Sequence, residues 1–195
     1  MDKQEVLQHF REAGALLEGH FLLSSGLHSP KYLQCALVLS DPRRAEVLCR
    51  ALADDIRQKL GPDGVDLVVG PAMGGVVVAY ELARQLGVRG IFAERVSGDF
   101  ALRRGFAIPE GARVVIAEDI VTTGLSSREC LNCIEGLGGE VVAVSCFVDR
   151  SGGKAAFGVP LVALTELDIP TYEPSAVPAD LAKIPAVKPG SRDVS

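Results

Sequence analysis

The sequence predicts an α/β protein in which a central parallel sheet is flanked by helices. Its 195 residues are 48% hydrophobic but only 5% aromatic, and most of the apolar residues are Val, Leu, Ile and Ala. This composition suits strands that helices cover on both faces. From residue 65 onwards, apolar runs of strand length alternate with helical patterns, the order typical of a parallel sheet. A chain of this length fits a single domain with one core.

The first forty residues are predicted to form a helix and a small antiparallel appendage. Apolar residues recur with a 3.6-residue period from Val6 to Leu17, which predicts a helix that ends before Gly19. Between residues 21 and 39, short apolar runs alternate with Ser, Gly and Pro. We expect two short strands there, joined by a turn around residues 25–30.

The rest of the chain is predicted to alternate between strands and helices. Asp41 is a helix cap followed by Pro42 at the first helical position. Helices are expected at residues 42–60, 75–86 and 126–137. Strands are expected at residues 65–69, 88–93, 113–117, 140–148 and 161–164. A long connection at residues 94–111 is of a kind that is usually functional or mobile. After residue 164, five prolines predict an irregular tail that wraps over the body.

Composition and charge argue against several classes of protein. The formal net charge is −5 with basic and acidic residues interspersed, so we expect no nucleic-acid surface, and any anionic ligand must be held locally. No apolar stretch reaches the length of a membrane span, and the N-terminal residues do not resemble a leader, so we expect a cytoplasmic protein without a membrane partner. Five scattered cysteines fit a reducing compartment. Cys130 and Cys133 form a C-x-x-C inside a predicted helix, without a second pair, and we interpret them as structural.

The most informative stretch is the predicted strand, turn and helix around residues 114–127. Backbone N–H groups of residues 122–126 would point out of a helix N-terminus, where they and the Thr and Ser hydroxyls favour a phosphate. No Gly-Lys-Ser/Thr follows, so the turn is not a triphosphate loop. Glu118 and Asp119 are acceptors suited to the two hydroxyls of a ribose diol. The segment therefore indicates a site for a phosphorylated ribose; the alternative is an ordinary helix cap after two solvated acids.

This segment resembles the phosphoribosyl diphosphate motif of the type I phosphoribosyltransferases. The resemblance implies a parallel sheet with a small N-terminal hood over its carboxyl edge. It implies one domain over residues 1–195, with a hood of about residues 1–40 plus a tail of about 165–195 and a core of about 41–164. The turn at residues 70–75 matches the place where the family binds diphosphate through main-chain donors; by itself it could be any βα loop. The implied phosphoribosyl diphosphate ligands are Glu118, Asp119, Ile120, Val121, Thr122, Thr123, Gly124, Leu125, Ser126, Ala72, Met73 and Gly74.

Two further segments are similar to the orotate phosphoribosyltransferases within that family. Residues 19–30, followed by Tyr32, resemble the hood signature that closes over the base. Val148-Asp149-Arg150 resembles the end of the strand where the family places an arginine on the orotate carboxylate, since a guanidinium grips a carboxylate with two parallel bonds. Arg150 alone could be a surface residue. The residues that the resemblance assigns to orotate are Thr122, Arg150, Ser25 and Tyr32.

The chain departs from the family in two places that bear on catalysis. The loop at residues 94–105 has no Lys or His, and Ser24 stands where many members have lysine. Arg95, Arg103 and Arg104 are the candidates to neutralise the leaving diphosphate, and with Asp119 they are the expected catalytic residues. The alternative is a solvated basic loop. The resemblance also implies that this loop completes the neighbouring subunit's site in a homodimer.

The reaction that the resemblance implies is transfer of the 5-phosphoribosyl group from phosphoribosyl diphosphate to orotate, giving orotidine 5′-phosphate and diphosphate for UMP biosynthesis. Mg²⁺ is the expected cofactor, bound through substrate oxygens, with no direct protein ligand and with Asp119 acting through a water. One alternative is a purine-type phosphoribosyltransferase, which should lack the hood signature and Arg150. Another is a phosphoribosyl-diphosphate-sensing regulator, which should carry a basic face or an added DNA-binding domain.

Overall fold

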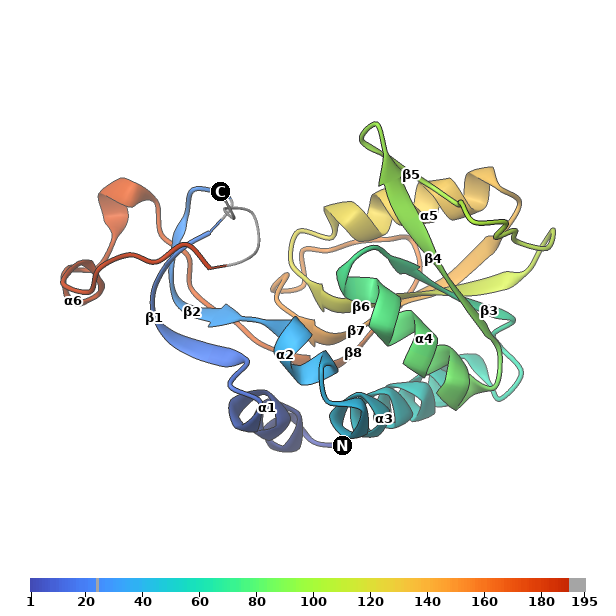
Figure 1. The fold of residues 1–195 in the computed structure, drawn as a ribbon, viewed down its shortest axis with the longest axis horizontal. Coiled ribbons are helices and arrows are strands. Elements are labelled where there is room, and N and C mark those ends of the chain that lie inside the picture. The colour runs from blue at the N-terminus through green and yellow to red at the C-terminus, as the bar shows by residue number, and fades with distance from the viewer. Residues whose placement is uncertain (24, 190–195) are drawn as a thin grey trace.

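A six-stranded sheet forms the centre of the protein in the computed structural model, which describes residues 1–23 and 25–189 (Figure 1). The strand order is β5-β4-β3-β6-β7-β8. The strands are β3 (Leu67–Pro71), β4 (Arg89–Val96), β5 (Asp99–Ala101), β6 (Arg113–Val121), β7 (Glu140–Asp149) and β8 (Leu161–Glu166). All neighbours pair in parallel except β5, which runs antiparallel to β4 at one edge. The predicted parallel sheet is confirmed, with one antiparallel edge strand added.

Helices cover both faces of this sheet. They are α1 (Lys3–Glu12), α2 (Cys35–Leu39), α3 (Pro42–Leu60), α4 (Gly74–Leu86) and α5 (Leu125–Gly136). On β6, Val115 and Ala117 pack into the cluster shared with α1 to α4, while Val114 and Ile116 pack into the cluster shared with α5. Both sides of the strand are therefore buried here, which explains the apolar run from Val114 to Ala117. No helix in the described part of the chain has the length and apolar character to cross a membrane.

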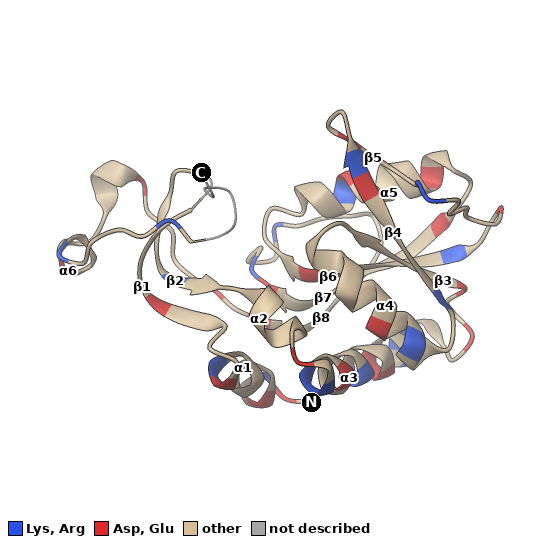
Figure 2. Cartoon of the chain, in the orientation of Figure 1, with Lys and Arg blue, Asp and Glu red and all other residues tan. Residues whose placement is uncertain are grey.

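Two helix boundaries follow the local signals closely. The Asp41 carboxylate accepts a hydrogen bond from the Arg43 N–H, and Pro42 opens α3 as predicted. Gly87 takes a left-handed conformation with φ of 78° and ends α4. Figure 2 shows acidic and basic residues interleaved along α1 and α3, in line with the mixed charge pattern of the sequence.

The first helix is shorter than predicted. It ends at Glu12, and Gly14 takes a φ of 64°, which turns the chain away from the helical path. Leu16 and Leu17 therefore begin the strand β1 (Leu16–Leu22) instead of continuing the helix. Strand β1 pairs antiparallel with β2 (His28–Leu33), so the predicted hairpin is confirmed. The second half of the segment expected as strands forms α2.

The C-terminal tail packs against this hairpin. The Val187 N–H donates to the His20 carbonyl and the Leu22 N–H donates to the Val187 carbonyl, both at 2.9 Å. His28 and Tyr172 exchange two backbone hydrogen bonds of 2.8 Å. The tail contains a 3₁₀ turn (Pro174–Ala176) and the short helix α6 (Ala179–Ala182), which lie beside β1 and β2 in Figure 1. Unpaired hairpin edges attract extended chain, and here the tail satisfies them.

Part of the predicted long connection is a second hairpin. Strand β4 continues to Val96, and β5 returns after a two-residue turn of Ser97 and Gly98. Both turn residues have positive φ, 54° and 103°, as a tight hairpin with twisted strands requires. The loop is thus shorter than expected, and it begins after Ala101.

Candidate active site

The carboxyl ends of β3, β6 and β7 carry most of the candidate residues. Glu118, Asp119, Ile120 and Val121 lie within β6 and pair with β7, so their predicted location in a turn was wrong. Successive residues of a strand point to opposite faces. The two acids accordingly point apart, Glu118 toward α5 and Asp119 toward α4.

Glu118 is a buried carboxyl group beneath the start of α5. Its side chain is 7% exposed and accepts a hydrogen bond of 3.5 Å from the Ser127 hydroxyl. Burial, with a smaller contribution from Asp119, raises the pKa of Glu118 to about 8. The group therefore carries a proton over much of the neutral range.

Asp119 lies against the first residue of α4. One of its carboxylate oxygens is 2.8 Å from the point where a Cβ atom on Gly74 would stand, so only glycine fits there. Burial raises the pKa of Asp119, while hydrogen bonding from the Ile120 N–H, at 2.8 Å, and from the Cys35 thiol lowers it. Cys35 is 3% exposed, and no sequence pattern indicated that it belongs to the site, because a lone cysteine in an apolar segment is typical of a core residue.

The glycine turn between β3 and α4 closes tightly over β6. A Cβ on Gly70 would stand 2.1 Å from the Gly75 carbonyl oxygen, and one on Gly75 would stand 2.5 Å from the Ala117 carbonyl oxygen. Of the predicted main-chain donors, the Ala72 N–H is engaged with the Ala93 carbonyl at 2.8 Å. Gly74, the first residue of α4, faces Asp119, and Met73 before it is exposed.

The predicted phosphate turn connects β6 to α5 and is open to solvent. Its members Thr122, Thr123, Leu125 and Ser126 are exposed, and Gly124 is the residue before the helix, with φ of 73°. The turn is held from outside by two residues that the sequence did not indicate. Arg128 donates to the Thr123 carbonyl at 2.9 Å, and the Phe157 ring packs against Gly124.

Arg150 is a half-buried cation that directly follows β7. Its Nε atom is buried and has no hydrogen-bond partner among the residues that the structure describes. Burial lowers the pKa of Arg150, and the nearby Cys35 and Tyr32 oppose that change. Burial also raises the pKa of Tyr32, with Asp119 contributing. An unpaired buried guanidinium is costly unless an anion joins it.

The structure thus brings Arg150, Tyr32 and Asp119 into one neighbourhood, as predicted, and adds Cys35. Ser25 is exposed in the turn of the first hairpin, where its hydroxyl accepts a hydrogen bond of 3.4 Å from the Leu27 N–H. Ser24, the other hood residue singled out in the sequence, lies outside the described residues.

The three loop arginines differ in their partners. Arg95 pairs with Glu129 of α5 and lies 4.3 Å from the Phe100 ring centroid. Arg104 donates twice to Glu94, at 3.0 and 2.8 Å. Arg103 is exposed, and within the described chain it has no carboxylate within ion-pair distance.

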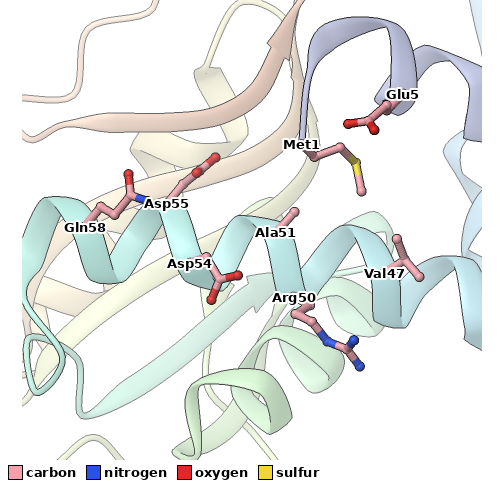
Figure 3. Close-up of a pocket in the computed structure, with 8 residues that line it drawn as sticks. All are labelled: Met1, Glu5, Val47, Arg50, Ala51, Asp54, Asp55 and Gln58. Atoms are coloured by element: carbon pink, nitrogen blue, oxygen red, sulfur yellow. The ribbon is translucent and has the colours of Figure 1, made fainter.

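One hollow of the described surface lies away from the candidate residues. It is a cavity of about 420 Å³ between the start of α1 and the outer side of α3 (Figure 3). Its lining mixes acidic, basic and apolar side chains and includes none of the candidate residues. Among the described residues, no group of three or more His, Cys, Asp or Glu is placed to hold a metal ion.

The parallel sheet, the glycine turn and the phosphate turn together define a phosphoribosyl transferase, and the family model of the phosphoribosyl transferase domain matches residues 39–156. The chain is 59% identical to the orotate phosphoribosyltransferase of Methylorubrum extorquens (strain PA1) over 98% of this chain and 97% of the relative. It is 54% identical to that of Maricaulis maris (strain MCS10) over the full length of both. This chain therefore belongs to the orotate phosphoribosyltransferase family.

Solved structures agree with this family. The orotate phosphoribosyltransferase from Aeropyrum pernix is 29% identical and superposes with a TM-score of 0.69, covering 83% of this chain and 93% of that chain. An adenine phosphoribosyltransferase superposes with a TM-score of 0.63 at 19% identity, covering 80% of this chain and 99% of that chain. At that identity the second likeness concerns the fold alone.

Proposed function

We propose that this chain transfers the 5-phosphoribosyl group of phosphoribosyl diphosphate to a ring nitrogen of orotate, which releases diphosphate. The observation that carries the proposal is the buried, unpaired Nε of Arg150 beside Tyr32, next to the strand that leads into the phosphate turn. A carboxylate on the acceptor base would supply the missing anion through two parallel hydrogen bonds. The names of the relatives at 54–59% identity support the same reaction.

The ligand's parts are assigned to the site as follows. The 5′-phosphate takes the N–H groups and hydroxyls of the turn at residues 122–126, and the diphosphate takes the start of α4 at Met73 and Gly74. The ribose hydroxyls take Asp119 and Glu118. Because Glu118 faces α5, this last assignment depends mainly on Asp119. Thr122 and Ser25 complete the base side.

Mg²⁺ fits the donor set at this place. Asp119 offers one carboxylate beside the start of α4, and Mg²⁺ is usually bound through one or two carboxylates while it keeps several waters. When bound, it would neutralise charge on the diphosphate oxygens. The residues would then act mainly by positioning the two substrates and by stabilising charge as the bond to diphosphate breaks.

Among the loop arginines we assign the role at the leaving diphosphate to Arg103. Arg95 and Arg104 are engaged by Glu129 and Glu94, so their charge is already compensated. Arg103 follows the β4–β5 hairpin in an exposed position. Replacing Arg103 should lower kcat by a larger factor than it changes the KM for either substrate.

A homodimer is supported by an exposed apolar face on α4. Met73, Val77 and Tyr80 follow one another at helical spacing and are 83%, 43% and 72% exposed. Large apolar side chains gathered on one face mark an interaction surface. Tyr80→Glu should give a monomer by sedimentation, and an unchanged dimer would reject this face. We also propose that about residues 1–40 and 165–195 form the hood, that about residues 41–164 form the core, and that the protein is cytoplasmic.

The direct test is loss of orotate absorbance on addition of phosphoribosyl diphosphate and Mg²⁺. Adenine, guanine and xanthine serve as matched acceptors in parallel reactions. Turnover of orotate alone supports the proposal. Turnover of a purine in its place would identify the purine-type reaction, and binding of phosphoribosyl diphosphate without any turnover would favour a sensor.

A further inference from the structure

Arg128 contacts the backbone of the phosphate turn. It lies on the first turn of α5, and its Nη2 donates to the Thr123 carbonyl at 2.9 Å. Its Nη1 lies 3.1 Å from the point where a Cβ on Gly124 would stand. Phe157 lies in the connection between β7 and β8, and its ring is 2.9 Å from the same point. The peptide between Thr123 and Gly124 is thus held by the hydrogen bond from Arg128, with the Phe157 ring packed against Gly124.

This hydrogen bond has a consequence for the amide on the opposite side of that peptide. In a trans peptide the C=O and N–H bonds point in opposite directions. With the Thr123 carbonyl directed at Arg128, the Gly124 N–H is directed away from it, toward the side where a phosphate would sit. A glycine in left-handed conformation is otherwise free to rotate, and ordering it costs conformational entropy.

We propose that Arg128 is a positioning residue for the 5′-phosphate, which orients the Gly124 N–H by binding the Thr123 carbonyl. This inference rests on the proposed function, because it assumes that the turn binds a phosphate. Arg128 acts through the backbone and needs no contact with the substrate. Its side chain is suited to the role because a guanidinium offers several donors in a rigid plane.

The test compares ribose 5-phosphate binding by calorimetry to four proteins. Arg128→Met removes the donor but keeps much of the stem, and Arg128→Lys keeps both a donor and the charge. Arg43→Met removes the same charge from an exposed position of α3. We expect roughly tenfold weaker binding for Arg128→Met, the ratio that one orienting hydrogen bond can supply. Arg128→Lys should lose less, and Arg43→Met should bind like the wild type.

Salt separates positioning from simple charge attraction. Attraction between exposed charges is largely screened at about 0.5 M salt but not at about 0.05 M. The difference between wild type and Arg128→Met should persist at both concentrations, and its disappearance at high salt would overturn the positioning role. Equal affinity of these two proteins at low salt would overturn it as well.

The same measurements distinguish this inference from the proposed function. If the wild type fails to bind ribose 5-phosphate, the phosphate site falls and Arg128 loses its role with it. If the wild type binds and Arg128→Met binds equally, only the role of Arg128 falls. Should Arg128→Met fail to fold, Arg128→Lys decides. In Arg128→Lys, the nuclear magnetic resonance signal of the Gly124 amide should move less on titration with ribose 5-phosphate than it does in the wild type. An identical movement in the two proteins would count against the inference.

Discussion

The two ends of the candidate site are built on different physical principles. At the phosphate end, the turn after β6 offers backbone N–H groups, and Arg128 and Phe157 hold it from outside. At the base end, Arg150 keeps a buried Nε without a partner in the described chain. Contacts within the protein therefore hold the phosphate turn in shape without a ligand. At the base end, by contrast, the Nε of Arg150 lacks a hydrogen-bond acceptor among the described residues.

This difference indicates which interaction should supply the binding free energy of each substrate. A braced turn binds through geometry, so substitutions that change backbone shape should affect the sugar phosphate most. An uncompensated guanidinium binds through charge, so its removal should affect the base most and should relieve the unliganded protein of a desolvation cost. The predictions below test this contrast.

The largest effect is expected from Arg150→Met. Losing one member of a buried charge pair costs several kcal/mol of binding free energy, so the KM for orotate should rise roughly a hundredfold or more. The KM for phosphoribosyl diphosphate should change little. The unliganded variant should unfold at a higher temperature than the wild type. Steady-state kinetics and thermal unfolding measure both. Equal effects on the two substrates, or a lower unfolding temperature, would break the contrast.

Gly124→Ala should affect the other end. The glycine has φ of 73°, and a methyl group would meet Phe157 at 2.9 Å. A left-handed residue other than glycine costs about 1–2 kcal/mol, so ribose 5-phosphate binding should weaken roughly tenfold or more with little effect on orotate. Gly136→Ala in the same helix is the matched control. Nothing lies within 4 Å of that position, and alanine there should leave binding unchanged.

The proton on Glu118 offers a test beneath the phosphate turn. Its folded pKa of about 8 lies above its ordinary value of 4.5, so the folded state keeps a proton that the unfolded state loses. The favourable contribution is complete below about pH 4.5 and is lost as the pH rises toward about 8. Glu118→Gln should therefore lose less stability than the wild type between these values. Urea unfolding across this range measures it, and parallel curves for the two proteins would contradict the assignment.

The fold was predictable where the signals are local. Asp41 with Pro42 and Gly87 mark helix ends through their own conformational preferences, and the order of strands and helices follows from apolar periodicity. The end of β6 was not predictable in this way. Glu118 and Asp119 are poor strand residues, and they are in a strand because β7 pairs alongside them, at Cys146 in the case of Glu118.

The same distinction applies to the site. The acids of β6 and the phosphate turn were accessible because their residue types suit a phosphorylated ribose, whereas Arg150 and Tyr32 were accessible through the family resemblance. Cys35 and Arg128 were not, because their importance lies only in what they contact, Asp119 and the Thr123 carbonyl. Proline content alone did not indicate that the tail packs on β1 and β2; only the resemblance grouped the tail with the hood.

The smallest effect is expected from Phe157→Ala, which sharpens the contrast from the phosphate side. The ring supports Gly124 without donating a hydrogen bond, and the Arg128 bond to Thr123 remains when the ring is removed. Ribose 5-phosphate binding should weaken only about threefold, less than the loss of one hydrogen bond. Orotate binding should not change, since Phe157 lies on the phosphate side. A loss as large as that of Gly124→Ala, measured by the same calorimetry, would mean that packing and not the arginine holds the turn.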